Sequence, residues 1–505
     1  MSLASSFLKV HQYYLTKAWK TLAFPTIKLT NLLSLFLKTS LALCTCFIIS
    51  LFFYLSLSLY HHNYNYSPFQ HPYHFIISHD PSTFENNNEP TNISHIVFGM
   101  GGSAKSWQDH RHYTEVWWQP NVTRGFMWLE QEPLVLAKET WPETLPPYKV
   151  SGVTSSFMYT NKVGLQFAIH LARILKETFQ LGLENVRWFV MGDNDTVFFT
   201  ENLVTVLAKY DHNEMYYIGD NSESVEQNVA QTYGMAFGGG GFAISYPLAE
   251  VLVKILDGCI NHYAVLFGSD QKVHACMSEI GVQLTKEPGF HQTDIRGNLY
   301  GLLAAHPIAP LVSLHHLHAS EPLFRDTGRV ESLKRFVSAY KMDPGRILQK
   351  SICYDPNRNW TFSVSWGYNV ELYRSLETSI ELQTTFKTFQ TWRGYEDPFT
   401  FNTRPVIPDQ CKRPVVFFLD QIEDGGLGEW TESSYKIYDN VLLEKSNCSL
   451  EVQYVNVTAS YFRPELWKKA PRRQCCDIIK GTDEASNVVE IVIRGCHQFE
   501  SVTPP

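Results

Sequence analysis

Residues 187–199 read RWFVMGDNDTVFF, in which an apolar run ends at the acidic turn Asp193-Asn194-Asp195 and a second apolar stretch follows. The run 186–191 (VRWFVM) predicts a buried strand. Just upstream, apolar residues recur at helical spacing within 165–180 and the pattern stops at Gly182, which predicts a helix. A helix that leads into a buried strand is typical of α/β folds, so we expect the acidic turn at the end of a strand of an α/β sheet.

Strands and helices are expected to alternate after residue 90, and strands alone to follow near the C-terminus. Residues 95–98 (HIVF) predict a strand that enters a tight turn at 99–102. Ser269 is expected to cap a helix that ends at Gly281. Further strands are predicted at 216–218, after the glycines of 237–245 (FGGGGFAIS), and at 415–419, 451–457 and 488–494. The chain from about Cys411 is thus predicted to form a small β-rich module.

Length and composition exclude several classes of protein. The chain has 505 residues, enough for two to four domains, and is 44% hydrophobic and 18% charged, which is unlike disordered, collagen-like or coiled-coil proteins. Five of its 42 basic residues lie in the first 38 positions, and no acidic residue precedes Asp80. The remaining chain therefore carries 37 basic and 50 acidic residues, an excess of acid that argues against binding to nucleic acid.

Residues 39–60 form an uncharged, largely apolar run of 22 residues. As a helix it is roughly 33 Å long, enough to cross a bilayer. A cleaved secretory signal is the alternative, but its apolar region is shorter and lies nearer the start of a chain. All the flanking lysines precede the run, so the positive-inside rule predicts a single-pass type II protein with residues 1–38 in the cytosol. Residues 61–90 are expected to be an extended stem.

Cysteines and glycosylation sequons agree with a lumenal location. Eight cysteines follow the apolar run, an even number that suits disulfide bonds in an oxidising compartment but leaves their pairing open. Sequons occur at Asn65, Asn92, Asn121, Asn194, Asn359, Asn447 and Asn456. The sequon at Asn194 lies within the acidic turn, and we expect it to be unused because the turn is buried.

The acidic turn is the first candidate for chemistry. Two carboxylates at the end of a buried strand can bind different groups: one can bind Mn²⁺ or Mg²⁺, and the other a water molecule or a ribose hydroxyl. Such an ion keeps open positions for the oxygens of a diphosphate. The alternative is a polar turn that only caps the strand. Asp193 and Asp195 are therefore candidates for binding a metal and a nucleotide.

Three other features of the sequence each give weaker evidence of a functional site when taken alone. The glycines 238–241 allow a ligand to approach the backbone, although a flexible turn is an equal alternative. Asp270 opens the helix after Ser269, where the helix N-terminus is expected to keep its carboxylate ionised; acidic residues there are more often structural. His315 and His316, in LHHLH, are candidate metal ligands or simply surface histidines. The chain has no Walker motif, no G-x-S-x-G and no H-E-x-x-H, which argues against ATPases, serine hydrolases and zinc proteases.

In order and spacing, these features resemble the Fringe-like branch of glycosyltransferase family 31, in particular its plant Fringe-related members. The resemblance covers about residues 91–330, and the same plant group extends through the C-terminal strands. The segments that carry it are 95–118 (HIVFGMGGSAKSWQDHRHYTEVWW), 187–199 (RWFVMGDNDTVFF), 216–220 (YYIGD), 237–245 (FGGGGFAIS), 268–277 (GSDQKVHACM) and 310–317 (PLVSLHHL).

The resemblance implies a GT-A type α/β nucleotide-sugar domain and a role for each matching residue. Asp195 and His315 are expected to bind Mn²⁺, with His316 as an alternative to His315, and Asp270 is expected to be the catalytic base. The nucleotide sugar is expected to contact Asp193, Arg111, Gly239, Gly240 and Gly241. Two departures from the family pattern matter: Asn194 replaces the middle acid of the turn, and Ser269 precedes Asp270 where animal enzymes have a second acid. The second departure weakens the assignment of the base.

The expected function is that of an inverting hexosyltransferase of the Golgi membrane, which transfers a sugar from a UDP-sugar to a glycan or glycoprotein in a β-1,3 linkage. The expected parts are the cytosolic tail, the anchor and the stem, followed by a transferase domain (91–345), a connecting region (346–410) and the β-rich module (411–505). Two alternatives stay open: a non-catalytic glycan-binding or scaffold protein of the same fold, and a metal-dependent phosphodiesterase.

Overall fold

The computed structural model describes residues 38–41, 43–54, 89–133, 141–392, 403–426, 428–438, 450–479 and 487–505. The chain divides into two compact units, Met1–Asn87 and Asn88–Pro505. In the first unit, residues 38–41 and 43–54 are helical, and the remainder of the expected tail, anchor and stem up to residue 88 lies outside the described residues. Among the residues described, no helix combines the length and the apolar character needed to cross a membrane.

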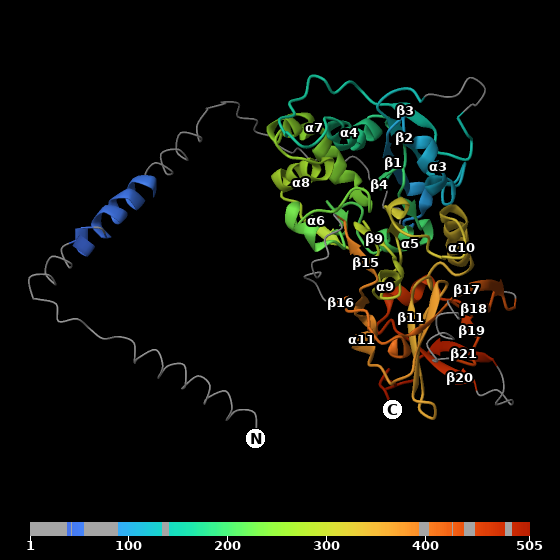
Figure 1. Cartoon of the computed structure of the whole chain (residues 1–505). Helices are drawn as coiled ribbons and strands as arrows, with labels where there is room; N and C mark the ends of the chain where they lie inside the picture. The colour runs from blue at the N-terminus through green and yellow to red at the C-terminus, as the bar shows by residue number, and fades with distance from the viewer. Residues whose placement is uncertain are drawn as a thin grey trace, which may run out of the picture. The chain divides into compact units, whose positions relative to one another are not determined.

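The second unit begins with a mixed sheet in the order β3-β2-β1-β4-β7-β6-β8 (Figure 1). Neighbouring strands are parallel except for β7, which runs antiparallel to both β4 and β6. The seven strands are β1 (Ile96–Gly102), β2 (Arg124–Leu129), β3 (Tyr148–Val150), β4 (Trp188–Asp193), β6 (Tyr217–Gly219), β7 (Phe242–Ser245) and β8 (Leu284–Lys286). The predicted α/β sheet is confirmed, with the acidic turn at the end of a central strand.

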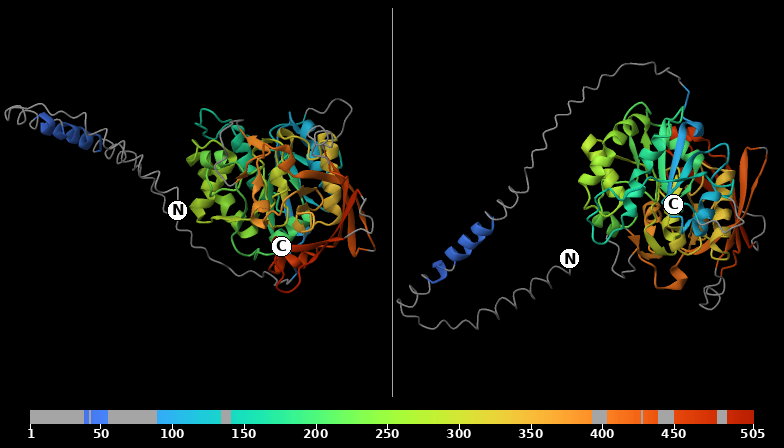
Figure 2. Two further views of the ribbon diagram at one scale, coloured as in Figure 1. Left: turned by 60° about the horizontal axis from the view of Figure 1, so that its bottom comes forward. Right: turned by 90° about the horizontal axis from the view of Figure 1, so that it is seen from above.

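Alternation along the strands gives this sheet two different faces. Val97 and Phe189 pack into one apolar cluster, while Ile96, Phe98 and Val190 pack into another. The first cluster lies under three helices that contact one another: α4 (Phe167–Phe179), α7 (Tyr246–His262) and α8 (Ser269–Ile280). Two further views show these helices gathered on one side of the second unit and the C-terminal strands on the other (Figure 2).

The glycines at 99–102 are part of β1, so the tight turn expected there is wrong. A side chain on Gly99 would lie 2.6 Å from Met191 Cε, and one on Gly101 would lie 2.6 Å from Leu171 Cδ2. These glycines therefore allow α4 to pack close to the sheet. The predicted helix at 269 is confirmed with a shift of one residue at its start, because Gly268 rather than Ser269 is its cap. Gly281 ends it with a φ of +86°.

A second sheet has eight strands in the order β11-β12-β13-β17-β18-β19-β21-β20. It begins at Lys350, so the expected connecting region 346–410 in fact supplies three of its strands. Its strands are β11 (Lys350–Asp355), β12 (Trp360–Ser365), β13 (Asn369–Tyr373), β17 (Val415–Asp424), β18 (Trp430–Ile437), β19 (Tyr454–Ser460), β20 (Gln474–Ile479) and β21 (Val488–Gly495). The edge strands β11 and β20 contact each other, which makes the sheet resemble a barrel.

Three disulfide bonds are present among the described residues: Cys259–Cys276, Cys353–Cys476 and Cys475–Cys496. The first joins α7 to α8, and the second joins the edge strands β11 and β20. Cys411 is also disulfide-bonded. The expectation of disulfide bonds is confirmed, and the pairing that the sequence left open is now given for these six cysteines.

One apolar core joins the two sheets, because buried residues from Ile96 of β1 to Ile493 of β21 belong to a single cluster. Residues 88–505 are therefore one compact unit rather than two separate modules. Three short ladders connect distant segments: β5 (Val197–Phe198) with β10 (Ser313–Leu314), β9 (Ile295–Gly297) with β15 (Phe389–Thr391), and β14 (Thr385–Phe386) with β16 (Thr403–Arg404). The other elements are η1 (Ile93–His95), α3 (Trp107–Glu115), α5 (Thr200–Leu207), α6 (Val225–Ala230), α9 (Tyr300–Leu303), η2 (Leu317–Ala319), α10 (Arg329–Met342), α11 (Ser379–Gln383), η3 (Gln410–Lys412) and η4 (Pro464–Lys468).

Candidate functional site

The acidic turn follows β4, next to the point where the strand order changes direction. From β1 the chain proceeds outward to β2 and β3 and then returns to β4 on the other side of β1. In open α/β sheets, ligands bind outside the carboxyl ends of the strands at such a point. Backbone hydrogen bonds hold the turn: the Asn194 amide donates to Gly101 O of β1 at 2.8 Å, and the Thr196 amide donates to Asp193 O at 3.0 Å.

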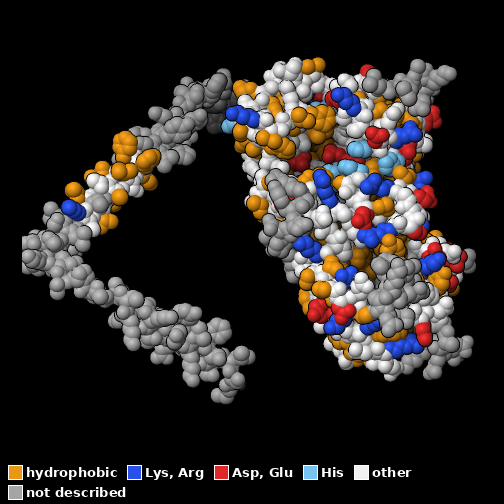
Figure 3. Space-filling view, in the orientation of Figure 1, with side chains coloured by type: hydrophobic (Ala, Val, Ile, Leu, Met, Phe, Trp, Pro, Cys, Tyr) orange, Lys and Arg blue, Asp and Glu red, His pale blue; other side chains and the backbone are white. Residues whose placement is uncertain are grey.

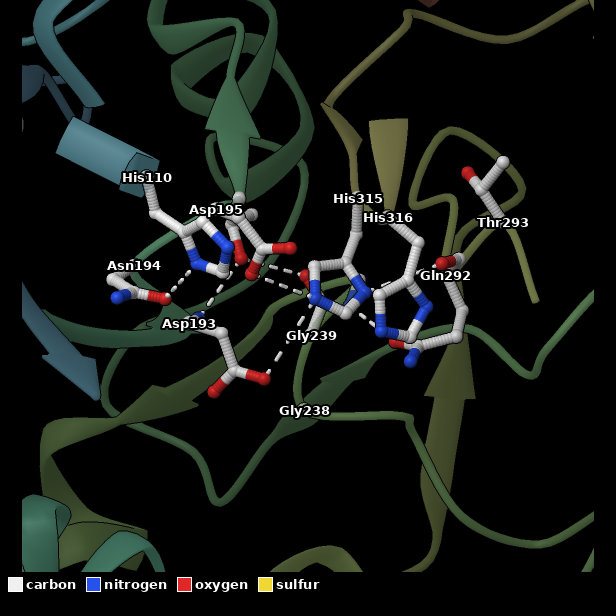
Figure 4. Close-up of polar contacts among 12 residues, drawn as sticks. His110, Asp193, Asn194, Asp195, Gly238, Gly239, Gln292, Thr293, His315 and His316 are labelled. Carbon is white, nitrogen blue, oxygen red and sulfur yellow. Dashed lines mark hydrogen bonds and ion pairs between the residues drawn. The ribbon is translucent and has the colours of Figure 1, made fainter. Parts of the chain in front are cut away.

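The short antiparallel ladder between β5 and β10 brings the histidines to this turn. Leu314 pairs with Val197, so His315 lies close to Asp195 although 120 positions separate them in the sequence. His315 Nε2 lies 3.0 Å from Asp195 Oδ1 and 3.8 Å from Asp193 Oδ2 (Figure 4). Asp195 Oδ2 lies 2.8 Å from Nδ1 of His318. One imidazole nitrogen thus faces two carboxylates.

The second ring nitrogen of His315 fixes which atom faces the acids. His315 Nδ1 lies 3.3 Å from the carbonyl oxygen of Gln292, which can only accept a hydrogen bond, so Nδ1 carries a proton. Nε2 is then the atom that either donates to Asp195 or offers its lone pair to a cation. Figure 4 shows His315 between Asp195 and Gln292.

The charges within this cluster are strongly coupled. Burial opposes the ionisation of Asp195, but the neighbouring histidines, above all His315, hold the pKa of this carboxyl well below its usual range. Burial also opposes the charge on His315, yet Asp195, Asp193 and Asp294 raise the pKa of this imidazole to about 9. Asp195 and His315 are 4% and 2% exposed, so this ion pair is shielded from water.

Asp193 and Asp270 are a different pair of acids. Both line one small pocket beneath α4 and α8. Burial and the neighbouring carboxylates raise the pKa of Asp193 to about 7, against the influence of His315. Burial also raises the pKa of Asp270, even though the Gly238 amide donates to its Oδ2 at 3.0 Å and Ser269 Oγ donates to its Oδ1 at 2.9 Å. Burial therefore opposes the charged carboxylate of Asp270, which we expected the helix N-terminus to keep ionised.

The structure gives a steric reason for the glycines before β7, because side chains at these positions would collide with residues of the site. A side chain on Gly239 would lie 2.0 Å from His315 Cε1, and one on Gly238 would lie 2.5 Å from Asp270 Oδ1. On Gly240 it would lie 3.0 Å from the Gln292 amide, and Gly241 has a φ of +83°. These glycines therefore leave room for the candidate metal ligand and the candidate base, whereas contacts of Gly239, Gly240 and Gly241 with a nucleotide sugar stay predictions.

His316 has a different set of neighbours. Its Nδ1 lies 3.0 Å from Asp294 Oδ1, and its ring stacks on Trp392 with centroids 4.5 Å apart. The ladder between β9 and β15 brings Trp392 to this position, because its neighbour Thr391 pairs with Ile295. Asp195, His315 and His316 nevertheless lie near enough for one atom of each to share a cation. Of the two histidines left open by the sequence, His315 is the one that contacts the acidic turn.

Arg111 does not join this cluster through any contact found among the described residues. It lies on α3, where its Nε is 3.8 Å from Glu115 Oε1 and its guanidinium lies 6.0 Å from the centre of the Trp107 ring. His110, from the same helix, reaches the turn instead: its Nδ1 lies 3.2 Å from Asn194 Oδ1. The expected contact between Arg111 and a nucleotide sugar stays a prediction.

Four residues around the site were missed by reasoning from the sequence: His110 and His318, which contact the turn, and Gln292 and Asp294, which contact His315 and His316. His110 and His318 stack on each other with centroids 5.1 Å apart, next to the turn. His318 had a signal, because it is the last residue of LHHLH, whereas Gln292 and Asp294 lie in a loop without periodicity. Histidine and acidic side chains gather on the face seen in Figure 3.

Asn194 is buried, as expected. It is 7% exposed, and its backbone carbonyl accepts a hydrogen bond from Thr114 Oγ1 at 3.1 Å. Its side chain oxygen faces His110, and Gly102 passes so close that a side chain there would lie 3.0 Å from Asn194 Cβ. The side-chain nitrogen that would carry a glycan is buried as well, and the unused sequon stays a prediction.

Comparison with protein families gives one match. The family described as a protein of unknown function, DUF604, matches residues 227–476, slightly less than half of the chain. The matched segment includes the glycines before β7, Asp270 and His315, and it begins after the acidic turn. No curated protein matches the chain.

Proposed function

We propose that this protein is a metal-dependent glycosyltransferase that moves a hexose or N-acetylhexosamine from a UDP-sugar to a glycan or glycoprotein. The observation that carries the proposal is the convergence of Asp193, Asp195 and His315 at the carboxyl end of β4. Carboxylates and an imidazole at the edge of an α/β sheet suit a divalent cation and a nucleotide diphosphate. The mixed α/β sheet and the resemblance of the motifs to Fringe-like enzymes support a GT-A type domain.

The donor set fits Mn²⁺ or Mg²⁺. Oxygen ligands suit both ions, and a neutral imidazole nitrogen favours Mn²⁺. The hydrogen bond at Nδ1 directs His315 Nε2 toward the carboxylates, as is usual for metal-binding histidines. In this assignment Asp195 and His315 hold the ion, with Asp193 beside them. When bound, the ion offsets the negative charge of the diphosphate.

The reaction assigned to the chain's own residues is a single displacement. Asp270 accepts the proton of an acceptor hydroxyl, the hydroxyl oxygen bonds to the anomeric carbon, and the bond from that carbon to the UDP oxygen breaks with inversion. A raised pKa favours this role, because a more basic carboxylate takes a proton more readily. The Gly238 amide and Ser269 Oγ orient the carboxylate of Asp270. Asp193 lines the same pocket, whose volume of about 30 Å³ is that of one water molecule, so it can bind an ion-bound water molecule there. A contact of Asp193 with ribose rests on the family resemblance alone.

We assign this activity to the Golgi lumen, with a type II anchor at 39–60. The lysines before the apolar run, the sequons and the disulfide bonds after it support this location. A β-1,3 linkage rests on the resemblance alone.

The decisive experiment combines donor binding with turnover. The purified full-length protein is screened against UDP-sugars by calorimetry with and without Mn²⁺, and each sugar that binds is tested for transfer. We expect Asp195→Ala to lose Mn²⁺-dependent binding of the donor and to lower the transfer rate at least about 100-fold. The variant should still melt cooperatively, which shows that it is folded. Asp420→Ala, at an exposed acid in β17, is the matched control and should retain both.

Other results would point elsewhere. Binding of a UDP-sugar without turnover on any glycan acceptor favours a glycan-binding or scaffold protein. Cleavage of the UDP-sugar by water to UMP and sugar 1-phosphate, at equal rates with and without acceptor, favours a phosphodiesterase. Full transfer by Asp195→Ala would refute the metal assignment.

A further inference from the structure

A second pocket lies apart from the acidic turn, where the edge strands β11 and β20 of the second sheet meet the C-terminal segment. It is a hollow of about 610 Å³ between the turn after α9, strand β11, helix α11 and the segment that leads into β20. Figure 1 shows α11, β11, β20 and the C-terminus together at the lower end of the second unit. Its volume is that of a site for a small molecule.

The lining of this pocket is basic. It contains Lys350 and Arg473, and it contains no aspartate or glutamate. Neither cation forms an ion pair with any described residue within 4.0 Å. Burial lowers the pKa of Lys350 to about 8, against the influence of Glu371, so the ammonium is charged at neutral pH. Glu371 itself accepts hydrogen bonds from Tyr300 and Tyr373.

Arg473 has unused hydrogen-bonding capacity. Its Nη2 donates to the carbonyl oxygen of Glu500, but its Nη1 is buried and has no hydrogen-bond partner. A buried guanidinium nitrogen without an acceptor is costly, and such groups usually have a partner that is an ion, a ligand or water. Nη1 is closed to solvent in this structure, so the guanidinium has to turn for this nitrogen to reach a ligand in the pocket. The Lys350 ammonium donates to Leu382 O, which leaves further donors available, since an ammonium has three.

The neutral part of the lining is mixed, and its apolar residues are Ala305, Pro307, Ile308, Ile352 and Val502. Ser379, Gln383, Gln474 and Ser501 add hydroxyl and amide groups that both donate and accept hydrogen bonds. A small inorganic anion would use only the two cations. A ligand with one carboxylate and several hydroxyls would use both parts of the lining.

We propose that this pocket binds a carboxylated carbohydrate, such as a uronic acid residue of a glycan, with the carboxylate held by Arg473 and Lys350. The planar guanidinium suits a carboxylate, and the amide and hydroxyl side chains suit the ring hydroxyls. The proposal goes beyond the transferase activity and does not depend on the acidic turn. Its site is formed by strands β11 and β20 of the second sheet together with the turn after α9, helix α11 and the C-terminal segment.

The test is calorimetry of the full-length protein with galacturonic acid, its trimer, galactose and inorganic phosphate. We expect galacturonate to bind at least about tenfold more tightly than galactose or phosphate. Arg473→Gln and Lys350→Gln should each weaken this binding by about tenfold or more. Lys412→Gln removes one positive charge at an exposed position and should leave the affinity unchanged.

A further variant guards against loss of folding in Lys350→Gln. Ser379→Trp places a large ring in the pocket without removing a charge, and it should abolish binding while the protein still melts cooperatively. Asp195→Ala should still bind galacturonate, which separates this proposal from the transferase activity. The proposal is overturned if galactose or phosphate binds as tightly as galacturonate, or if folded Arg473→Gln keeps the affinity of the unaltered protein.

Discussion

Gly239 is the residue at which the geometry of the site is most sensitive to a single added atom. A Cβ there would lie 2.0 Å from His315 Cε1, so the imidazole has to move away from Asp195. We expect Gly239→Ala to weaken Mn²⁺ binding by about 10- to 100-fold, the usual effect of disturbing a ligand's orientation. Calorimetric titration with Mn²⁺ measures this change.

Gly258→Ala is the matched control for that substitution. Gly258 is exposed within helix α7, and a side chain there would meet no atom within 4 Å. We expect it to leave Mn²⁺ binding unchanged and to stabilise the protein by about 0.5–1 kcal/mol, because alanine favours a helix over glycine. Equal Mn²⁺ affinity in both variants would show that His315 does not bind the ion.

Asp270 is expected to act on the chemical step rather than on binding of the donor. Asp270→Asn keeps the size of the side chain and an oxygen that can accept from Gly238, but it removes the group that takes the proton. We expect UDP-sugar affinity to stay within about threefold while transfer at saturating donor falls by at least about 100-fold. Comparing calorimetry with turnover separates the two effects, and normal turnover would exclude Asp270 as the base.

The sequence predicted most of the elements near the site but not the ladder that assembles it. Strand β4, helix α4 and helix α8 all lie close to their predicted positions, because apolar periodicity and glycine stops mark them. Strands β5 and β10 have two residues each, too few to give a periodic pattern. Their pairing is what brings His315 to Asp195, and before the structure only the family resemblance linked the two residues.

The disulfide bond Cys353–Cys476 should stabilise the folded protein more than Cys259–Cys276 does. It joins edge strands β11 and β20 across 123 positions, whereas Cys259–Cys276 spans 17 positions between α7 and α8. Because a longer closed loop restricts the unfolded chain more, we expect Cys353→Ala/Cys476→Ala to cost about 2–4 kcal/mol and to exceed the cost of Cys259→Ala/Cys276→Ala. Denaturant unfolding of both double variants without reductant measures the difference. An equal or reversed order would contradict the prediction.

The expected boundary of the β-rich module at residue 411 is wrong, because the strands of this sheet are interrupted in the sequence by a long segment. Strands β11 to β13 are separated from β17 by residues 374–414, which contain a short helix and small ladders. The sequence predicts the strand at 415–419, but nothing in it shows that this strand continues a sheet begun by β11, β12 and β13. Pairing of β13 with β17 and the shared core make residues 88–505 a single unit.

Glycan occupancy tests both the proposed type II topology and the burial of the acidic turn. Asn121 and Asn359 are exposed at positive φ, at 65° and 57°, whereas Asn194 is 7% exposed. If the body of the protein is lumenal, mass spectrometry of the protein from its own secretory pathway should find glycans on Asn121 and Asn359 and none on Asn194. The exposed sites serve as internal controls for access to the glycosylation machinery. Glycans absent from every sequon would contradict the type II topology, while a glycan on Asn194 would mean that the turn is open enough to be modified and would contradict a buried metal site there.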